Sequence, residues 1–201
     1  MTDRPETFLA HLRTAAVGVL ERFPAELRPE IYALSFRVWR VDDDDRRPYV
    51  AVGYNTETQY ERERAPDDDG EARWNYAHWL LEGFETLGNV PEDPVGSRVY
   101  EEEVRSLGVW YDGEVDLDRL LDDEDVAARA ALLRAHFCDA VIDLARQLHA
   151  DGVIERVLGR PLPVVVFDMA RPGWEAHATR AANPPALTED FTAWLRDAGE
   201  I

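Results

Sequence analysis

A long stripe of apolar residues at helical spacing constrains the fold of this chain more than any other feature. Successive members are separated by four, three, four, four, three and four positions, which predicts an amphipathic helix over about 123–150. The acids at 122–125 suit the positive end of a helix dipole, and Asp151-Gly152 suits its C-terminal end. The stripe consists of Val126, Ala130, Leu133, Phe137, Val141, Leu144 and Leu148.

Two segments near the N-terminus have the alternation and composition of β-strands. The first, "IYALSFRVWRV" (31–41), places on one face Tyr32, Leu34, Phe36 and Val38. The second is "YVAVGY" (49–54), and the acidic turn between the two predicts an antiparallel hairpin. A buried strand is predicted at 163–168, in "PLPVVVFDM". We therefore expect an α+β fold, with an antiparallel sheet that begins with the 31–54 hairpin, includes the 163–168 strand and is covered by helices.

Further helices are predicted before, between and after these strands. Helical spacing runs from Phe8 to Phe23, and "NTETQYERER" (55–64) forms a helix capped by Asn55 or Thr56. "RWNYAHWLLEGFETL" (73–87) also has the pattern of a helix, and Thr188 caps a last one in "EDFTAWLRDAG". With 201 residues, 45% of them hydrophobic, and no repeat or linker, the chain is expected to form one globular domain over 1–201.

The charge restricts the classes of partner. The formal net charge is −19, and all 22 basic residues are arginine, so lysine-dependent chemistry is excluded. Acids cluster at 42–45, 66–69, 101–103 and 122–125. A field of this sign repels nucleic acid and anionic membranes, and it attracts a basic protein or a cation. The alternative is that the acids only maintain solubility.

The sequence offers little for catalysis or for metal and cofactor binding. It contains no GxGxxG, GxxxxGK, GxSxG, HExxH or CxxC motif, and its five histidines are scattered. The single cysteine, Cys138, excludes an internal disulfide and predicts a reduced, cytoplasmic protein. We expect no catalytic residue, no metal site and no cofactor.

Asp168 ends the predicted 163–168 strand, where many enzymes place a catalytic carboxylate. Glu175 is the second carboxylate that it could work with in acid–base chemistry. The structural alternative, which we favour, is that Asp168 caps a turn or pairs with Arg171 or Arg180. Asn183, which precedes two prolines, is expected to form a turn.

The order of these segments resembles a family of uncharacterised bacterial proteins associated with toxin-immunity loci. The resemblance extends from Ile31 to Pro185 and rests on "IYALSFRV", "YNTET", "RWNYAHW", the long helix, and "VFDM" followed by "TRAANPP". The "DDDD" turn and the acidic region at 112–125 depart from the pattern. The resemblance implies a small acidic protein that neutralises a toxin, and its pattern falls here on Asn55, Thr56, Trp74, Trp79, Asp168 and Asn183.

These observations favour an acidic binding protein over an enzyme, and the resemblance implies an immunity-type protein. The acids at 42–45, 66–69 and 112–125 are then expected to converge into one surface that engages a basic protein, with an exposed tryptophan as anchor. The expected contact residues are Asp43, Asp44, Asp68, Asp122, Asp123, Asp125 and Trp79. The alternatives are a small hydrolase or transferase centred on Asp168 and a DNA-mimic inhibitor. The sequence does not define the oligomeric state.

Overall fold

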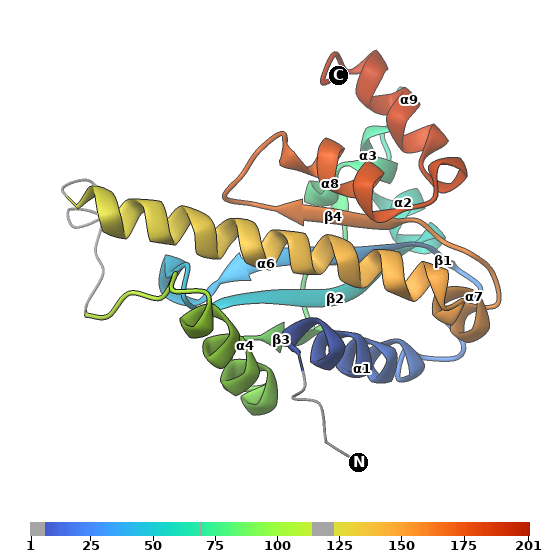
Figure 1. Ribbon diagram of the computed structural model, residues 1–201. Coiled ribbons are helices and arrows are strands. Elements are labelled where there is room, and N and C mark those ends of the chain that lie inside the picture. The colour runs from blue at the N-terminus through green and yellow to red at the C-terminus, as the bar shows by residue number, and fades with distance from the viewer. Residues whose placement is uncertain (1–6, 69, 114–122) are drawn as a thin grey trace.

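The computed structural model describes residues 7–68, 70–113 and 123–201. Within these residues, helices pack against both faces of a four-stranded sheet (Figure 1). The strands are β1 (Ile31–Arg40), β2 (Pro48–Thr56), β3 (Glu85–Gly88) and β4 (Val164–Asp168). The helices are α1 (Phe8–Glu21), α2 (Glu57–Glu63), α3 (Glu71–Trp74), α4 (Pro94–Ser106), α6 (Glu124–Ala150), α7 (Val153–Leu158), α8 (Trp174–Ala182) and α9 (Glu189–Asp197). Short 3-10 turns are η1 (Val41–Asp43), η2 (Tyr76–His78) and η3 (Pro185–Leu187).

The sheet is mixed, so the α+β class is confirmed but the expectation of an antiparallel sheet is wrong. Its strand order is β3-β2-β1-β4, in which β2 pairs antiparallel with both β1 and β3. β4 pairs parallel with β1, with Leu34 opposite Val164 and Val38 opposite Asp168. A parallel neighbour needs a crossover connection. The chain supplies it through α6 and α7, which return it to the end of the sheet where β1 begins (Figure 1).

The predicted alternation in the first strand fails at Tyr32. The pairing of β1 with β2 shifts register between Ile31 and Ala33, because Tyr32 is an extra residue in a β-bulge. The side chains of Leu34, Phe36 and Val38 lie in the main core, whereas Tyr32 packs on the opposite face of the sheet. The bulge thereby provides an aromatic ring to a second, smaller core.

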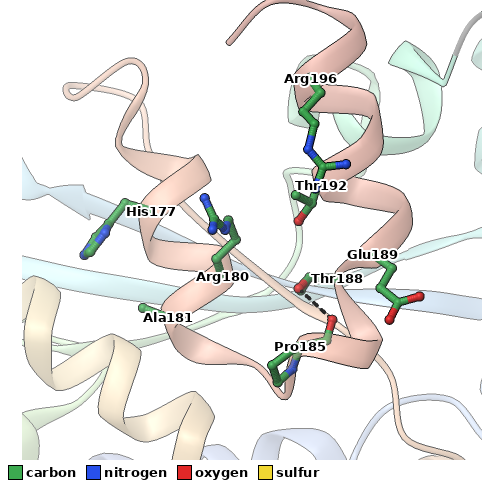
Figure 2. A pocket seen from close by; sticks show the side chains of 8 residues that line it. All are labelled: His177, Arg180, Ala181, Pro185, Thr188, Glu189, Thr192 and Arg196. Atoms are coloured by element: carbon green, nitrogen blue, oxygen red, sulfur yellow. Dashed lines mark hydrogen bonds between the residues drawn. The ribbon is translucent and has the colours of Figure 1, made fainter. Parts of the chain in front are cut away.

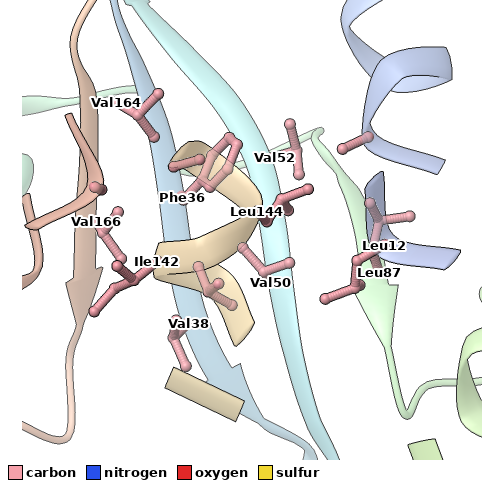
Figure 3. Close-up of a cluster of buried hydrophobic side chains, with 14 of the residues drawn as sticks. Leu12, Phe36, Val38, Val50, Val52, Leu87, Ile142, Leu144, Val164 and Val166 are labelled. Atoms are coloured by element: carbon pink, nitrogen blue, oxygen red, sulfur yellow. The ribbon is translucent and has the colours of Figure 1, made fainter. Parts of the chain in front are cut away.

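The long helix is confirmed as α6, and it crosses one face of the sheet with α1 and α4 on the same side (Figure 1). All seven residues of its apolar stripe are buried, none more than 4% exposed. Figure 3 shows Ile142 and Leu144 of this helix close to the valines of β1, β2 and β4. At its N-terminus, Asp123 accepts hydrogen bonds from the amides of Asp125 and Val126. The sequence pattern thus identifies the main core correctly.

The helix predicted over 73–87 is wrong. α3 ends at Trp74, and Asn75 is extended (φ −80°, ψ 114°) because its side chain accepts a hydrogen bond from the amide of Ala77 and starts η2. Gly83 has a left-handed φ of +82°, and β3 begins at Glu85. The apolar residues of this segment are therefore buried by tertiary packing and not by one helix face.

The remaining short helices agree with their predicted positions but not with every predicted cap. Thr56 caps α2 by accepting a hydrogen bond from the amide of Gln59. Thr188 precedes α9 but makes no side-chain cap, because its hydroxyl donates to the carbonyl oxygen of Pro185. None of the helices in the described part of the chain combines the length and the apolar character that crossing a bilayer requires.

Candidate functional site

Asp168 is almost fully buried, with 1% of its surface exposed, and both of its oxygens bind the same guanidinium group. Arg40 donates to them over 3.0 and 2.7 Å, and the amide of Ala170 donates to Oδ1 over 3.0 Å. The partner is therefore Arg40, and the predicted pairing with Arg171 or Arg180 is wrong. The error arose because the parallel pairing brings the end of β4 beside the end of β1.

The same guanidinium joins Asp168 to the acidic turn. Arg40 also donates to Asp45, and Asp45 takes two hydrogen bonds from Arg134 of α6, over 3.1 and 2.6 Å. Burial alone lowers the pKa of Arg40, but the hydrogen bond and charge of Asp168 outweigh it, and the pKa lies above its ordinary value. This network ties β1, β4, α6 and the turn together.

The other aspartates of the turn are mostly neutralised by nearby arginines. Asp44 is half-buried and pairs with Arg46 at 2.7 Å, whereas the exposed Asp42 pairs with Arg47 at 2.8 Å. Asp43 is exposed, and no ion pair to it is found within the described ranges. Of the two contact residues predicted here, only Asp43 therefore presents an unpaired carboxylate to solvent.

Asp68 lies at the opposite end of the sheet from this turn. Its Oδ1 accepts hydrogen bonds from the amides of Gly70 and Ala72 at the start of α3, and α3 packs on Tyr32 near the start of β1. Eight residues of strand separate Tyr32 from Arg40, roughly 26 Å. The predicted convergence of the acids at 66–68 with those at 42–45 is therefore wrong (Figure 1).

Of the three acids before the long helix that were predicted to contact a partner, two have structural roles. Asp123 is the N-cap of α6, and Asp125 pairs with Arg129 one turn further along at 2.8 Å. Asp122 lies outside the described residues, as does most of the 112–125 region. Asp123 and Asp125 thus have a local role in starting the helix, where negative charge is favourable.

Trp79 is not the surface anchor that we predicted. It is 5% exposed, and its indole N–H donates to the carbonyl oxygen of Arg73 over 3.0 Å. Trp74, at 7% exposed, packs edge-on to Tyr32 in the same small core. Both tryptophans are thus part of the smaller core that contains Tyr32.

The remaining positions of the predicted pattern are Asn55 and Asn183. Both are buried polar residues whose side chains form hydrogen bonds inside the fold. Asn55 donates to the hydroxyl of Tyr32 over 2.8 Å. Asn183 accepts a hydrogen bond from the amide of Val164 and donates to its carbonyl oxygen, both at 2.7 Å. Thr179, which sequence reasoning missed, does the same for Val166. Thr179 of α8 and its C-cap residue Asn183 thereby satisfy the free edge of β4, which explains the spacing in "TRAANPP".

His149 should make folding stability fall in acid. Its Nε2 donates to Asn183 Oδ1 over 2.9 Å, and burial lowers its pKa below the usual value. The depressed folded-state pKa provides stability above about pH 6.5 that is lost as pH falls further. We expect the wild type to lose more stability than His149→Gln between about pH 7 and 5, because protonation of the buried imidazole opposes folding only in the wild type. Denaturant unfolding at each pH measures this difference, and parallel curves would refute it.

A cavity of about 360 Å³ lies where α3, η2, β4, α8 and α9 meet. Four aromatic rings line it, from Trp74, Tyr76, Phe191 and Trp194. Tyr76 stacks face to face on Phe167 of β4 at 4.2 Å, and Phe191 contacts both tryptophan rings at 5.8 and 5.9 Å. These contacts hold the aromatic walls in place.

The polar lining of this cavity is acidic. Glu71, Glu175 and Glu200 all line it, and no arginine or histidine is among the described residues of its lining. Oε2 of Glu175 is buried and has no hydrogen-bond partner within the described chain. Burial raises the pKa of Tyr76, and the nearby charges of Glu175 and Asp168 raise it further. The cavity is therefore lined by acidic side chains, one of which has a carboxylate oxygen without a hydrogen-bond partner in the described chain.

Carboxylates among aromatic faces are the combination that binds organic cations. Ring faces attract a guanidinium or ammonium group, and a buried carboxylate pairs with it. The sequence could not reveal this site, because its residues come from 71–76, 165 and 172–200, which only the parallel placement of β4 brings together. Glu175 was singled out as a partner for Asp168, but no hydrogen bond joins the two in the described part of the chain.

No group of three histidine, cysteine or acidic side chains that could hold a metal ion is found among the residues that the structure describes. Cys138 is buried, and burial raises the pKa of its thiol to about 11, so the thiolate is disfavoured at neutral pH. Comparison of the chain with family models, with curated proteins and with solved structures finds no match in any of the three.

Proposed function

We propose that this chain is a non-enzymatic acidic binding protein, an immunity-type protein that neutralises a basic partner protein in the cytoplasm. The observation that carries this proposal is the cavity lined by Trp74, Tyr76, Trp194 and Glu175, with its unpaired carboxylate oxygen. An arginine or lysine side chain of the partner inserts there. The net charge of −19 steers the partner towards the protein before this contact forms.

The contacts available in the cavity suit a single inserted side chain. A guanidinium group on an indole face gains about 0.5–2 kcal/mol, and the carboxylate of Glu175 in the lining supplies its counter-ion. An inserted side chain of this kind, surrounded by a rim that excludes water, is the usual form of an interface hot spot. The exposed acids around it contribute mainly to the association rate.

The alternative functions have less support. A hydrolase or transferase centred on Asp168 would need a free carboxylate, but Arg40 occupies both of its oxygens. A DNA mimic would need unpaired acids spaced like phosphates, but Asp42, Asp44 and Asp45 each pair with an arginine. The Asp168 carboxylate and three of the four turn aspartates are therefore engaged within the fold.

Replacing Glu175 by glutamine should weaken the binding of a basic peptide about tenfold or more, because the buried carboxylate is the counter-ion of the inserted cation. The probe is a hexa-arginine peptide, titrated calorimetrically at low and at physiological salt. Trp194→Ala should weaken the same binding by removing a ring face.

The matched control is Glu155→Gln, which removes the same charge from an exposed position on α7. It should change the affinity less than about twofold, since an exposed charge acts only through the screened general field. Equal losses in Glu155→Gln and Glu175→Gln would show that the peptide senses net charge alone, and they would overturn the proposed site.

A further inference from the structure

A second, larger hollow of about 740 Å³ lies between α8 and α9, on the other side of α9 from the aromatic cavity. Arg180 of α8 and Arg196 of α9 line it from opposite sides (Figure 2). Thr192 lies between them, and Glu189 is at the far end of the hollow near Pro185. This lining is basic at its centre, in contrast to the acidic aromatic cavity.

These two arginines differ from most others in the chain. Arginines elsewhere pair with carboxylates, as Arg13 does with Asp151, or bond backbone carbonyls, as Arg160 does. Within the described residues, the guanidinium groups of Arg180 and Arg196 make no ion pair or hydrogen bond, although acids outnumber bases 41 to 22. Two like charges facing one hollow repel each other, so an anion between them would be stabilised by both.

We propose that this hollow is an anion-binding site for a phosphate group. Two guanidinium groups supply several N–H donors in planar forks, the geometry that binds phosphate oxygens in pairs. The two positive charges match the charge of a phosphate monoester, which is about −1.5 to −2 at neutral pH. The hydroxyl of Thr192 adds a donor beside them (Figure 2).

The surroundings define what kind of phosphate fits. The volume falls in the range of small-molecule sites, so there is room for more than the bare ion. The hollow is lined by few apolar side chains, which favours a small polar phosphomonoester over an aromatic nucleotide base. The overall negative field opposes any anion, so binding depends on the local pair of arginines and on nothing further away.

The test is a calorimetric and NMR titration of the full chain in phosphate-free buffer. The probes are inorganic phosphate and O-phosphoserine, with succinate as the carboxylate dianion. We expect saturable binding of both phosphates, with amide shifts confined to α8 and α9. O-phosphoserine binding tighter than inorganic phosphate indicates a phosphomonoester ligand, whereas succinate binding as tightly as either phosphate would overturn the phosphate assignment.

Variants make the site assignment falsifiable. Arg180→Gln and Arg196→Gln should each weaken phosphate binding about tenfold, since each removes charge-assisted hydrogen bonds. Glu189→Gln should strengthen it, because it removes a negative charge from the hollow. Arg156→Gln, an exposed substitution on α7, is the matched control and should have little effect. Absence of saturable binding, or an Arg156→Gln loss equal to the other two, would overturn the proposal.

The outcome is independent of the proposed partner-binding function. Glu175 and the aromatic rings lie in the other cavity, so Glu175→Gln should leave phosphate binding unchanged. The arginine variants in turn leave the pocket for a cationic side chain intact. Either function can therefore fail while the other stands.

Discussion

Replacing Phe137 by alanine should lower the free energy of unfolding by about 3–5 kcal/mol. Phe137 is 1% exposed at the centre of α6, and its ring contacts those of Phe8 and Tyr100 at 5.8 and 5.9 Å. The substitution loses the burial of an aromatic ring and leaves a cavity between α1, α4 and α6, which rigid neighbours fill only partly. Chemical denaturation followed by tryptophan fluorescence measures the loss.

Leu132→Ala is the matched control on the same helix. Leu132 is 54% exposed, so its truncation removes little buried surface, and we expect a change within about 0.5 kcal/mol. A Phe137→Ala variant as stable as Leu132→Ala would mean that α6 does not pack on the sheet through its apolar stripe.

The helix is the part of the fold that sequence reasoning could determine. A repeat sustained from Val126 to Leu148 fixes which face is buried, because many residues agree on one period. The segment 73–87 has apolar residues at comparable density but over a shorter span. There, the local hydrogen bond of Asn75 and the left-handed Gly83 redirect the chain, and neither is visible in the period.

The direction of β4 lies beyond pattern analysis for a different reason. A continuous apolar run such as "VVVF" indicates a strand buried on both faces, but its direction depends on which end of the sheet the preceding helices reach. The direction of β4 determines which residues meet in the buried network and in the aromatic cavity. Parallel pairing brings Asp168 to Arg40, and it brings Glu175 and Trp194 to the cavity beside Trp74.

The acidic turn shows that a run of acids in the sequence does not reveal which carboxylates are exposed and unpaired. Asp43 and Asp45 are two residues apart, yet one is exposed without an ion pair in the described chain and the other is buried between two arginines. Formal charge counts both equally. Asp45 is paired with Arg40 of β1 and with Arg134 of α6, and the 89 residues that separate it from Arg134 hide the second pairing from the sequence.

The second large effect on stability is expected from breaking the buried network around Arg40. The side chains of Arg40 and Asp168 are 6% and 0% exposed, and Arg40 is also bound to Asp45, which is 5% exposed. Desolvating three charges is unfavourable unless every one keeps its partners. The arrangement therefore contributes less to stability than its short distances suggest, and removing one member is much worse than removing a matched pair.

Replacing Arg40 by methionine should accordingly destabilise the protein by about 3–5 kcal/mol, because Asp168 is left buried and charged without a cation. The double variant with Asp168→Leu should recover part of that loss, which a double-mutant cycle of unfolding free energies measures. Arg47→Met is the matched control: Arg47 pairs with Asp42 in solvent, so its loss should be at most about 1 kcal/mol. If Arg40→Met and Arg47→Met were equally mild, or the double variant were no better than the sum of its parts, Asp168 would not depend on Arg40. A free carboxylate at the end of β4 would then restore the case for acid–base chemistry at that position.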